Sequence, residues 1–498
     1  MQGKKQYHEK LFVNFQLSDR VPEDNFYRRL RELVDFKFLY KSTTKYYGKE
    51  GQKSIDPVVF MKLILVGYLE NLNSDRRIIN SCKLRLDVLY FIGYDLDEEL
   101  PWHSTLSRTR KLYGKEVFSQ VFKSVLKQCI DKGMITGRRQ AIDGFFIKAN
   151  ASMDSIVEQE ILADADIYSN ELEANEEDGR ETVIRDVEKG TVDEDAAKSK
   201  KSLRKKIRYS PSDPDARMSI KSGKPMALNY LGEISVDTAS HVITHAQAFT
   251  AEKNDSPHLP EVVKNVIETL KEHELTVEEV IADTGFSSGE AIKSLEESGI
   301  IGYIPNRALF VYERPGFTYH EEGDFYNCPN DKKLTYRGTH NDGDYANKHY
   351  RANKKDCNVC PLKSTCTVYK KTGSLIKETV DRPYYVLMHH RMQSEQAGRL
   401  MKLRQSTVEP VIGTLVNYLG IKRVNCKGLV QADKCLTIAA TAYNLKKLLK
   451  LIFWCVKMRQ KVKDWLSGVM DPPTHFVNAL LKNTQLVVIP LQATLLQR

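Results

Sequence analysis

The sequence predicts an α/β core that follows a helical region and is interrupted by a small cysteine-rich segment. Residues 20–135 contain apolar positions at helical spacing, whereas strand-like and helix-like segments alternate from residue 138 onward. That alternation is typical of an α/β layer. Four of the nine cysteines lie between Cys328 and Cys366. A chain of 498 residues is long enough for two or three units of this kind.

Composition narrows the class of protein. The formal net charge of +10 favours a polyanionic partner, although many basic proteins never bind nucleic acid. No segment approaches the roughly 20 uncharged apolar residues that a membrane span needs. Residues 1–10 are polar and lack the apolar centre of a secretory signal. We therefore expect a cytoplasmic protein with no membrane partner.

The helical region, residues 1–137, has basic side chains near the predicted helix starts. Asp56-Pro57 is a typical start, Ser74-Asp75 opens a further helix, and Ser104 is a candidate cap. A helical DNA-binding domain would carry cations in such places, but so would the solvated faces of an ordinary bundle. The candidate DNA contacts in this region are Arg76, Arg77, Arg108, Arg110 and Lys111.

The α/β core is predicted to begin at residue 138 and its first part to end at 305. Expected strands are 141–149, 226–230, 233–237, 242–249, 277–283 and 300–304, with a turn at Gly232. Expected helices are 258–270 and 289–298. A second part, 383–460, is predicted to be helical, and 461–498 is a tail without an informative pattern.

Two segments interrupt this core. Residues 154–216 are acidic first and basic afterwards, as in a solvated and mobile insertion, although the basic half could also bind phosphates. Residues 306–382 contain the cysteine-rich segment. Its Cys-x2-Cys pair, with two further cysteines, matches the closed set that structural zinc requires. The zinc ligands would be Cys328, Cys357, Cys360 and Cys366. Separate reduced thiols are the alternative.

The other five cysteines are predicted to be small core residues: Cys82, Cys129, Cys426, Cys435 and Cys455.

Three carboxylates are candidates for chemistry. Asp143 lies within an apolar strand, where a charged group is costly unless it binds a metal or a hydrogen-bond donor. Asp283 ends a predicted strand, where ligands collect in α/β sheets, but Asp-Thr-Gly is also ordinary turn chemistry. Glu409 borders an apolar helical stripe, and Ser406-x-x-Glu409 also matches a capping box.

Such a set suits phosphodiester cleavage. Two divalent ions about 4 Å apart can generate the attacking oxygen and stabilise the leaving oxygen. Mg²⁺ prefers hard oxygen ligands and keeps several waters, so two or three carboxylates are enough to hold it. Two strand-borne aspartates and a helix-borne glutamate would supply these ligands from rigid elements.

The blocks around these acids resemble those of bacterial insertion-sequence DDE transposases. They are Ile-Asp-Gly at Asp143, Ala-Asp-Thr-Gly-Phe at Asp283 and Val-Glu-Pro-Val-Ile-Gly at Glu409. The resemblance extends to residues 212–217 (Ser-Asp-Pro-Asp-Ala-Arg), to Lys422-Arg423 and to the helical N-terminal region. It covers most of the chain. Each block is a weak signal alone, and their common order makes the match specific.

The resemblance implies an RNase H-like core with a mixed sheet and a DNA transposase activity. That activity is Mg²⁺-dependent (or Mn²⁺-dependent) cleavage and strand transfer at the terminal inverted repeats of an insertion sequence. Asp143, Asp283 and Glu409 would be the catalytic residues and the metal ligands. The implied partners are the double-stranded DNA of the repeats and of the target. A homodimer or larger assembly on nucleoid DNA of a bacterial cell is also implied.

The sequence departs from this family around the glutamate. Related transposases often have a tyrosine and an arginine shortly before it and a lysine one or two turns after it. Here Arg404 stands five residues ahead without a tyrosine beside it, and Val416 and Asn417 occupy the place of the lysine. Arg404, Lys422 and Arg423 remain candidate DNA contacts. A decayed transposase that only binds DNA, or a nuclease of the same fold, are the alternative functions.

Overall fold

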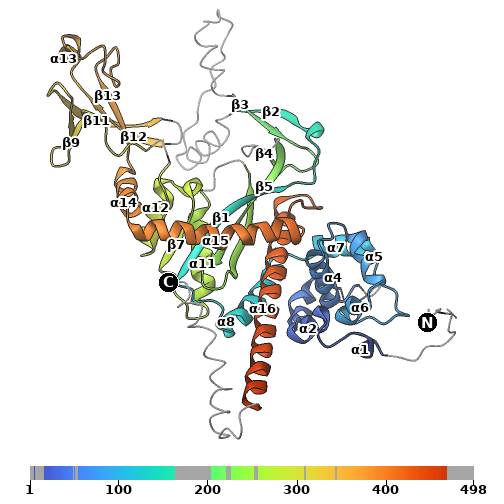
Figure 1. The fold of residues 1–498 in the computed structure, drawn as a ribbon. Coiled ribbons are helices and arrows are strands. Elements are labelled where there is room, and N and C mark those ends of the chain that lie inside the picture. The colour runs from blue at the N-terminus through green and yellow to red at the C-terminus, as the bar shows by residue number, and fades with distance from the viewer. Residues whose placement is uncertain are drawn as a thin grey trace, which may run out of the picture.

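The structure is a computed structural model, drawn in Figure 1. It describes residues 5, 16–48, 50, 54–162, 204–219, 226–251, 256–307, 310–342 and 345–467. Most of the predicted charged insertion (163–203) and most of the predicted tail (468–498) lie outside these residues. Among the helices described, none has the length and apolar character to cross a membrane.

The N-terminal region folds into short helices. They are α1 (Leu17–Arg20), α2 (Phe26–Leu33), α3 (Phe38–Thr43), η1 (Thr44–Tyr46), α4 (Pro57–Leu69), α5 (Asp75–Lys83), α6 (Leu86–Ile92), α7 (His103–Leu112) and α8 (Lys115–Asp131). The predicted start at Asp56 is confirmed, because its carboxylate accepts hydrogen bonds from the backbone N–H groups of Val58 and Val59. The predicted cap at Ser104 is wrong by two residues, since α7 has Trp102 at its N-cap position.

The core is a mixed sheet with the strand order β4-β5-β1-β7-β8, and β6 pairs with β5. The strands are β1 (Arg139–Lys148), β4 (Arg217–Ser219), β5 (Ala227–Asp237), β6 (Ile243–Thr250), β7 (Glu279–Ile281) and β8 (Ile301–Tyr303). β1 is antiparallel to β5 and parallel to β7, and β7 is parallel to β8. The mixed α/β sheet expected from the sequence is therefore present.

The turn predicted at Gly232 is wrong. β5 runs without interruption through this residue, which lies opposite Phe145 of β1 and Ala248 of β6. A Cβ atom at Gly232 would lie 2.8 Å from the Cδ1 atom of Ile147. The glycine therefore permits close packing of side chains over the sheet and does not mark a reversal of the chain.

Helices cover the sheet, and α15 (Glu395–Tyr418) matters most for function. It lies against β1 and β7, and Figure 1 shows it crossing the core. α16 (Leu429–Ser467) packs against β6 and also against α8 and α4. The remaining helices of this layer are α11 (Leu259–Lys271), α12 (Gly289–Glu297) and α14 (Arg382–Met392). α16 also contributes Ile438, Ala442 and Leu445 to the apolar core of the N-terminal helices.

Residues 318–379 form a second sheet, the accessory sheet, which Figure 1 shows apart from the core and next to α14. Its strands are β9 (Thr318–His320), β10 (Phe325–Asn327), β11 (Lys333–Asp342), β12 (Tyr345–Arg351) and β13 (Leu375–Thr379), and all neighbours are antiparallel. A short helix, α13 (Lys354–Asn358), follows β12. A small core of its own includes Tyr326, Leu334, Tyr350 and Ile376. A separate hairpin is formed by β2 (Val157–Leu162) and β3 (Arg204–Tyr209).

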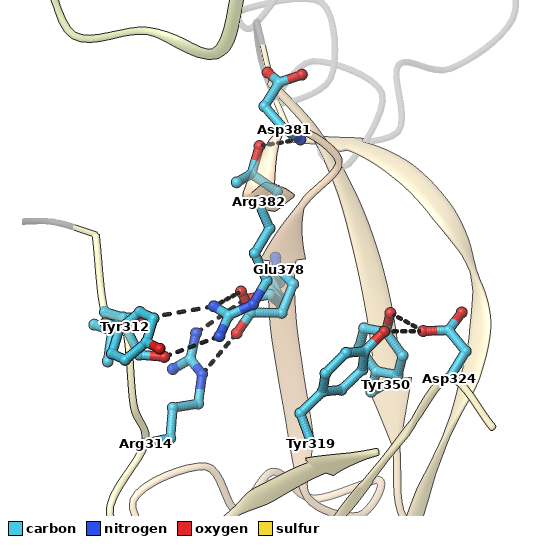
Figure 2. A network of polar contacts seen from close by, with 11 residues as sticks. Tyr312, Arg314, Tyr319, Asp324, Tyr350, Glu378, Asp381 and Arg382 are labelled. Atoms are coloured by element: carbon cyan, nitrogen blue, oxygen red, sulfur yellow. Dashed lines mark hydrogen bonds and ion pairs between the residues drawn. The ribbon is translucent and has the colours of Figure 1, made fainter. Parts of the chain in front are cut away.

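A buried carboxylate ties the accessory sheet to α14. Glu378 of β13 accepts hydrogen bonds from Arg314 and from Arg382, each at 2.9 Å, as Figure 2 shows. Arg382, in the first turn of α14, also donates to the carbonyl oxygen of Tyr312 at 2.9 Å. These charge-assisted bonds hold the end of the accessory sheet against the start of the segment that leads into α15.

Candidate active site

Asp143 lies on β1 beyond the part of that strand that pairs with β7. The parallel pairing covers residues 139–141, whereas Asp143 is paired only on the other side, opposite Ile234 of β5. Its Oδ1 atom accepts a hydrogen bond from the Gly144 N–H at 2.8 Å, and the side chain is 13% exposed. The interior of the strand therefore holds this carboxylate in place, with its Oδ1 atom fixed by the backbone.

Asp283 follows β7 by two residues and caps η3 (Thr284–Phe286). Its Oδ1 atom accepts a hydrogen bond from the Gly285 N–H at 2.9 Å, so the ordinary turn chemistry expected here is present. β7 is parallel to β1 and adjacent to it, so their carboxyl ends meet at one edge of the sheet. That edge brings Asp283 towards Asp143.

Arg404 of α15 joins the two aspartates. Its Nη2 atom lies 2.9 Å from Oδ2 of Asp143 and 3.5 Å from Oδ2 of Asp283. The arginine residue is 5% exposed. Each carboxylate thus uses Oδ1 for its own backbone and directs Oδ2 to a common cation. The sequence pointed to Arg404 only as a DNA contact, and its place between the aspartates could not be read from its spacing.

Glu409 does not join this pair. It lies inside α15 and is exposed, and in the described part of the chain no three His, Cys, Asp or Glu residues are arranged to hold a metal ion. The capping box at Ser406 is wrong, because α15 begins much earlier, where the Ser394 hydroxyl accepts a hydrogen bond from Ala397 N–H. The structure therefore brings together two of the three predicted acids.

The candidate DNA contacts divide into exposed and buried groups. Arg110 is buried, and its guanidinium binds Asp75 through two hydrogen bonds of 2.6 and 3.0 Å. Burial disfavours its charge, but the hydrogen bonds and the charge of Asp75 outweigh that effect and raise the pKa of Arg110. Arg404 is the other buried member. The exposed members are Arg76, Arg77, Arg108, Lys111, Lys422 and Arg423.

The loop that carries Lys422 and Arg423 lies beside the end of β1. The Lys422 carbonyl accepts a hydrogen bond from Lys148 N–H at 3.1 Å, and Arg423 donates to the side-chain oxygen of Asn150 at 3.0 Å. Just before this loop, the Asn417 carbonyl accepts a hydrogen bond from the side chain of Asn71, in the N-terminal helical region. Hydrogen bonds therefore connect the segment around Lys422 and Arg423 both to the end of β1 and to the N-terminal helical region.

Residues 212–217, which the sequence marked by resemblance, connect the start of the core to α16. Asp213 is fully buried, and it accepts hydrogen bonds from the Tyr230 hydroxyl at 2.5 Å and from Gly428 N–H at 2.9 Å. Asp215 accepts a hydrogen bond from Leu429 N–H at 2.8 Å, at the start of α16. These contacts give both aspartates a positioning role.

Four thiols of the accessory sheet line a single cavity of about 260 Å³. They belong to Cys328, Cys357, Cys360 and Cys366. The Ser374 hydroxyl lies between two of them, 3.4 Å from the Cys357 sulfur and 3.5 Å from the Cys366 sulfur. No pattern in the sequence pointed to this serine. Thiols that share one small cavity fit the donor chemistry of a structural zinc ion, although they are not gathered at ligand distances.

The remaining cysteines are not all core residues. Cys82, Cys129 and Cys435 are buried, as expected, whereas Cys426 and Cys455 are partly exposed. Burial raises the pKa of the Cys82 and Cys129 thiols to about 12 in each case. The sulfur atoms of Cys426 and Cys435 lie 3.4 Å apart, and their hydrogen bond holds the pKa of the Cys435 thiol below its usual range.

Two protein-family models match the chain. Residues 15–112 match a transposase domain of the family DUF772, and residues 327–449 match a transposase DDE domain. The chain is a DNA transposase of the DDE type. The DDE match contains Glu409, Arg404 and the four clustered cysteines. The DUF772 match spans the described helices from α1 to α7. A DDE transposase cleaves DNA and transfers the strands.

Comparison with solved structures found distant similarity to two transposase complexes. One is the piggyBac transposase synaptic complex with hairpin DNA, at 10% identity and a TM-score of 0.29 over 90% of this chain and 81% of that chain. The other is the Mos1 transposase paired-end complex with the left transposon end, at 9% identity and a TM-score of 0.16 over 55% of this chain and 70% of that one. No curated protein matched the transposase sequence.

Proposed function

We propose that Asp143 and Asp283 bind the catalytic divalent metal of this transposase, Mg²⁺ or Mn²⁺, and that Glu409 completes the site. The observation that carries this proposal is the shared contact with Arg404, in which one nitrogen lies near an Oδ2 atom of each aspartate. Two carboxylate oxygens that converge on one cation are suitable ligands for a hard divalent ion. Their Oδ1 atoms are fixed by backbone N–H groups, so the pair is oriented before any metal arrives.

The protein's own contribution is to hold these carboxylates at the edge of a rigid sheet. A bound divalent ion would activate the attacking oxygen and stabilise the leaving oxygen of the phosphodiester. Asp143 is held within a paired strand and Asp283 within a capped turn, so neither needs to move to present its Oδ2 atom. Glu409 has to approach from α15.

We further propose that the core is RNase H-like. The order β6-β5-β1-β7-β8 supports this reading, since the first three strands are antiparallel neighbours and the last three are parallel. In this reading residues 138–305 and 383–460 are the two parts of the catalytic core. Residues 306–382 are a cysteine-rich insertion between them, and 1–137 is the DNA-binding domain.

The proposed substrates are the terminal inverted repeats of an insertion sequence and the target DNA, on the nucleoid of a bacterial cell. The exposed cations on α5, on α7 and in the loop at Lys422 would contact backbone phosphates and set the position of the DNA. Two DNA ends require two active sites, so a homodimer or larger assembly on DNA is part of this proposal. Arg110 is left out of the DNA interface because Asp75 already binds its guanidinium.

We propose a structural role for the four clustered cysteines as zinc ligands. Their common cavity and their soft thiol donors support this role. A zinc ion there would hold α13 and the loop before β13 against the turn at Cys328, at one end of the accessory sheet.

The test is cleavage of a labelled duplex that bears the element's own ends, with Mg²⁺ or Mn²⁺. Wild type is compared with Asp143→Asn, Asp283→Asn and Glu409→Gln. Glu395→Gln is the matched control, because Glu395 is also an exposed glutamate of α15 and its side chain pairs with Arg399, which is exposed as well.

We expect the three site variants to bind the ends and fail to cut them, while Glu395→Gln cuts like wild type. If Asp143→Asn or Asp283→Asn still cleaves the DNA, these residues do not hold the catalytic metal. Wild type that binds the ends but does not cut them in either metal would favour a decayed transposase that acts as a DNA-binding protein.

A further inference from the structure

A single helix supplies both the cation that contacts the two aspartates and the acid that should join them at the metal. α15 contains Arg404, which is buried against Asp143 and Asp283, and Glu409, which is exposed. In the described residues the Glu409 side chain has no ion pair or hydrogen bond. The resident counter-ion of the two aspartates is therefore an arginine of the same helix.

The geometry of the helix keeps these two residues from facing the aspartates together. Successive residues of an α-helix are turned by about 100°, so five positions place Glu409 about 140° around the axis from Arg404. The buried side of α15 is centred on Arg404, and its neighbours there include Leu400, Thr407 and Val411. With this side against β1, Glu409 is directed away from it.

The helix has a weak point next to Glu409. Pro410 follows Glu409 inside α15, and proline lacks the N–H group that would donate to the carbonyl four residues earlier. The Ser406 hydroxyl donates to the Leu403 carbonyl oxygen at 3.0 Å, a local bond that often accompanies a bend in a helix. The helix can therefore bend or turn next to Glu409 at lower cost than elsewhere.

The guanidinium of Arg404 also lacks one of its possible hydrogen bonds. Its Nε atom is buried and has no hydrogen-bond partner among the described residues. A buried donor without a partner makes its position less favourable than the two ion pairs alone suggest. Without metal, however, Arg404 offsets the repulsion between two neighbouring carboxylates. A divalent ion would offset this repulsion with more charge. It cannot bind between the two carboxylates while the guanidinium is there.

We propose that Arg404 is a positioning residue that exchanges with the divalent metal, so that metal entry bends α15 next to Pro410 and brings Glu409 to Asp143 and Asp283. This inference rests on the proposed metal site. The resting form holds arginine and excludes the glutamate, and the active form holds metal and the glutamate. An arginine brake of this kind keeps the metal-free enzyme from assembling its three acids.

The test is Mn²⁺ binding to the full-length chain, measured by calorimetry without DNA. Arg404→Met removes the charge and keeps the apolar stem, so metal no longer has to displace a cation. We expect it to bind Mn²⁺ about tenfold more tightly than wild type, within the usual range of coupling between two ligands of one site. Arg399→Met is the matched control on the same helix, because Arg399 is 76% exposed and pairs with Glu395, and it should bind like wild type.

A second variant covers the case in which Arg404→Met does not fold. Arg404→Lys keeps the charge on a single nitrogen, and its Mn²⁺ affinity should lie between those of wild type and Arg404→Met. Glu409→Gln should weaken Mn²⁺ binding in both the wild-type and the Arg404→Met backgrounds, since the glutamate joins the metal once the arginine has left.

Equal or weaker Mn²⁺ binding by Arg404→Met, with binding that still depends on Asp143, would overturn the exchange and leave the metal site intact. Mn²⁺ binding that Asp143→Asn does not affect would instead overturn the metal site, and the exchange with it. Unchanged binding in Glu409→Gln would contradict the bending of α15 towards the aspartates. These outcomes separate the failure of this inference from that of the proposed function.

Discussion

Asp75 and Arg110 form a bidentate ion pair between the start of α5 and the end of α7, and both side chains are nearly buried. Their exposed fractions are 12% and 9%. Lys434 of α16 donates a hydrogen bond to the Arg110 carbonyl oxygen at 3.0 Å. The pair therefore lies where the helical region meets α16, and it holds together two helices that carry the exposed cations of the proposed DNA interface.

Removal of the Arg110 side chain should lower the stability of the protein and have little effect on DNA binding. Arg110→Met leaves the Asp75 carboxylate buried without its partner, which costs about 3–5 kcal/mol of unfolding free energy. The matched variant Arg108→Met, at an exposed position of α7, should change stability by less than about 0.5 kcal/mol. It should lower the salt dependence of DNA binding by about one phosphate contact. Denaturant unfolding and salt-dependent binding measure these effects, and the reverse pattern would show that Arg110 contacts DNA.

His245 should make the protein less stable as the pH falls. Burial lowers the pKa of this β6 histidine to about 4, from an ordinary value near 6.5. The unfolded chain therefore binds a proton that the folded protein does not, and stability is lost as the pH falls from about 6.5 towards 4. His245→Gln should reduce that loss by about 2 kcal/mol. Unfolding by denaturant at pH 7 and pH 4.5 measures it, and identical pH dependence in the two proteins would contradict the prediction.

Glycine 232 should not tolerate a larger residue. In Gly232→Ala the new methyl group would meet the Ile147 side chain at 2.8 Å and Leu436 at 3.2 Å, which should cost about 1–3 kcal/mol of unfolding free energy. Gly398 of α15 has open space around it, so Gly398→Ala should stabilise the protein by about 0.5–1 kcal/mol. Thermal unfolding distinguishes them, and a neutral Gly232→Ala would mean that the core relaxes around the methyl group.

The clustered cysteines should hold metal, unlike the isolated ones. We expect about one zinc ion per purified chain, and loss of that zinc in Cys360→Ser. Cys455→Ser is the matched control, because Cys455 is also partly exposed and does not line the cavity of the cluster. Metal analysis measures the content, and a chelator should lower the melting temperature of wild type only if zinc is bound. Equal zinc in the two serine variants would exclude this site.

Local patterns predicted the elements of the core well. The apolar run around Asp143 became β1, and the alternation after residue 138 became the mixed sheet, because a half-buried strand is encoded in neighbouring residues. The helix predicted at 258–270 became α11, one residue later. The prediction of a turn at Gly232 was wrong because the residue type alone does not distinguish a glycine in a turn from a glycine at a close packing contact.

Ser406-x-x-Glu409 failed as a capping box for a related reason. The local spacing is right, but α15 had already begun at Glu395, and burial of its Arg404 side against the sheet extended it through Glu409 and Pro410. Tertiary packing of an amphipathic helix outweighs the preference of a few residues for a helix start.

By itself, the sequence determined which residues are candidates for the chemistry: one aspartate within a strand, one just after a strand, a glutamate on a helix and four cysteines in one short segment. These depend on residue type and local pattern. Only the tertiary structure decided that Arg404 lies between Asp143 and Asp283 and that Glu409 faces away. Asp143 and Arg404 are distant in sequence, and their contact depends on how α15 packs against β1. The rotation of a helix about its own axis is set by its whole buried face, and no short motif encodes it.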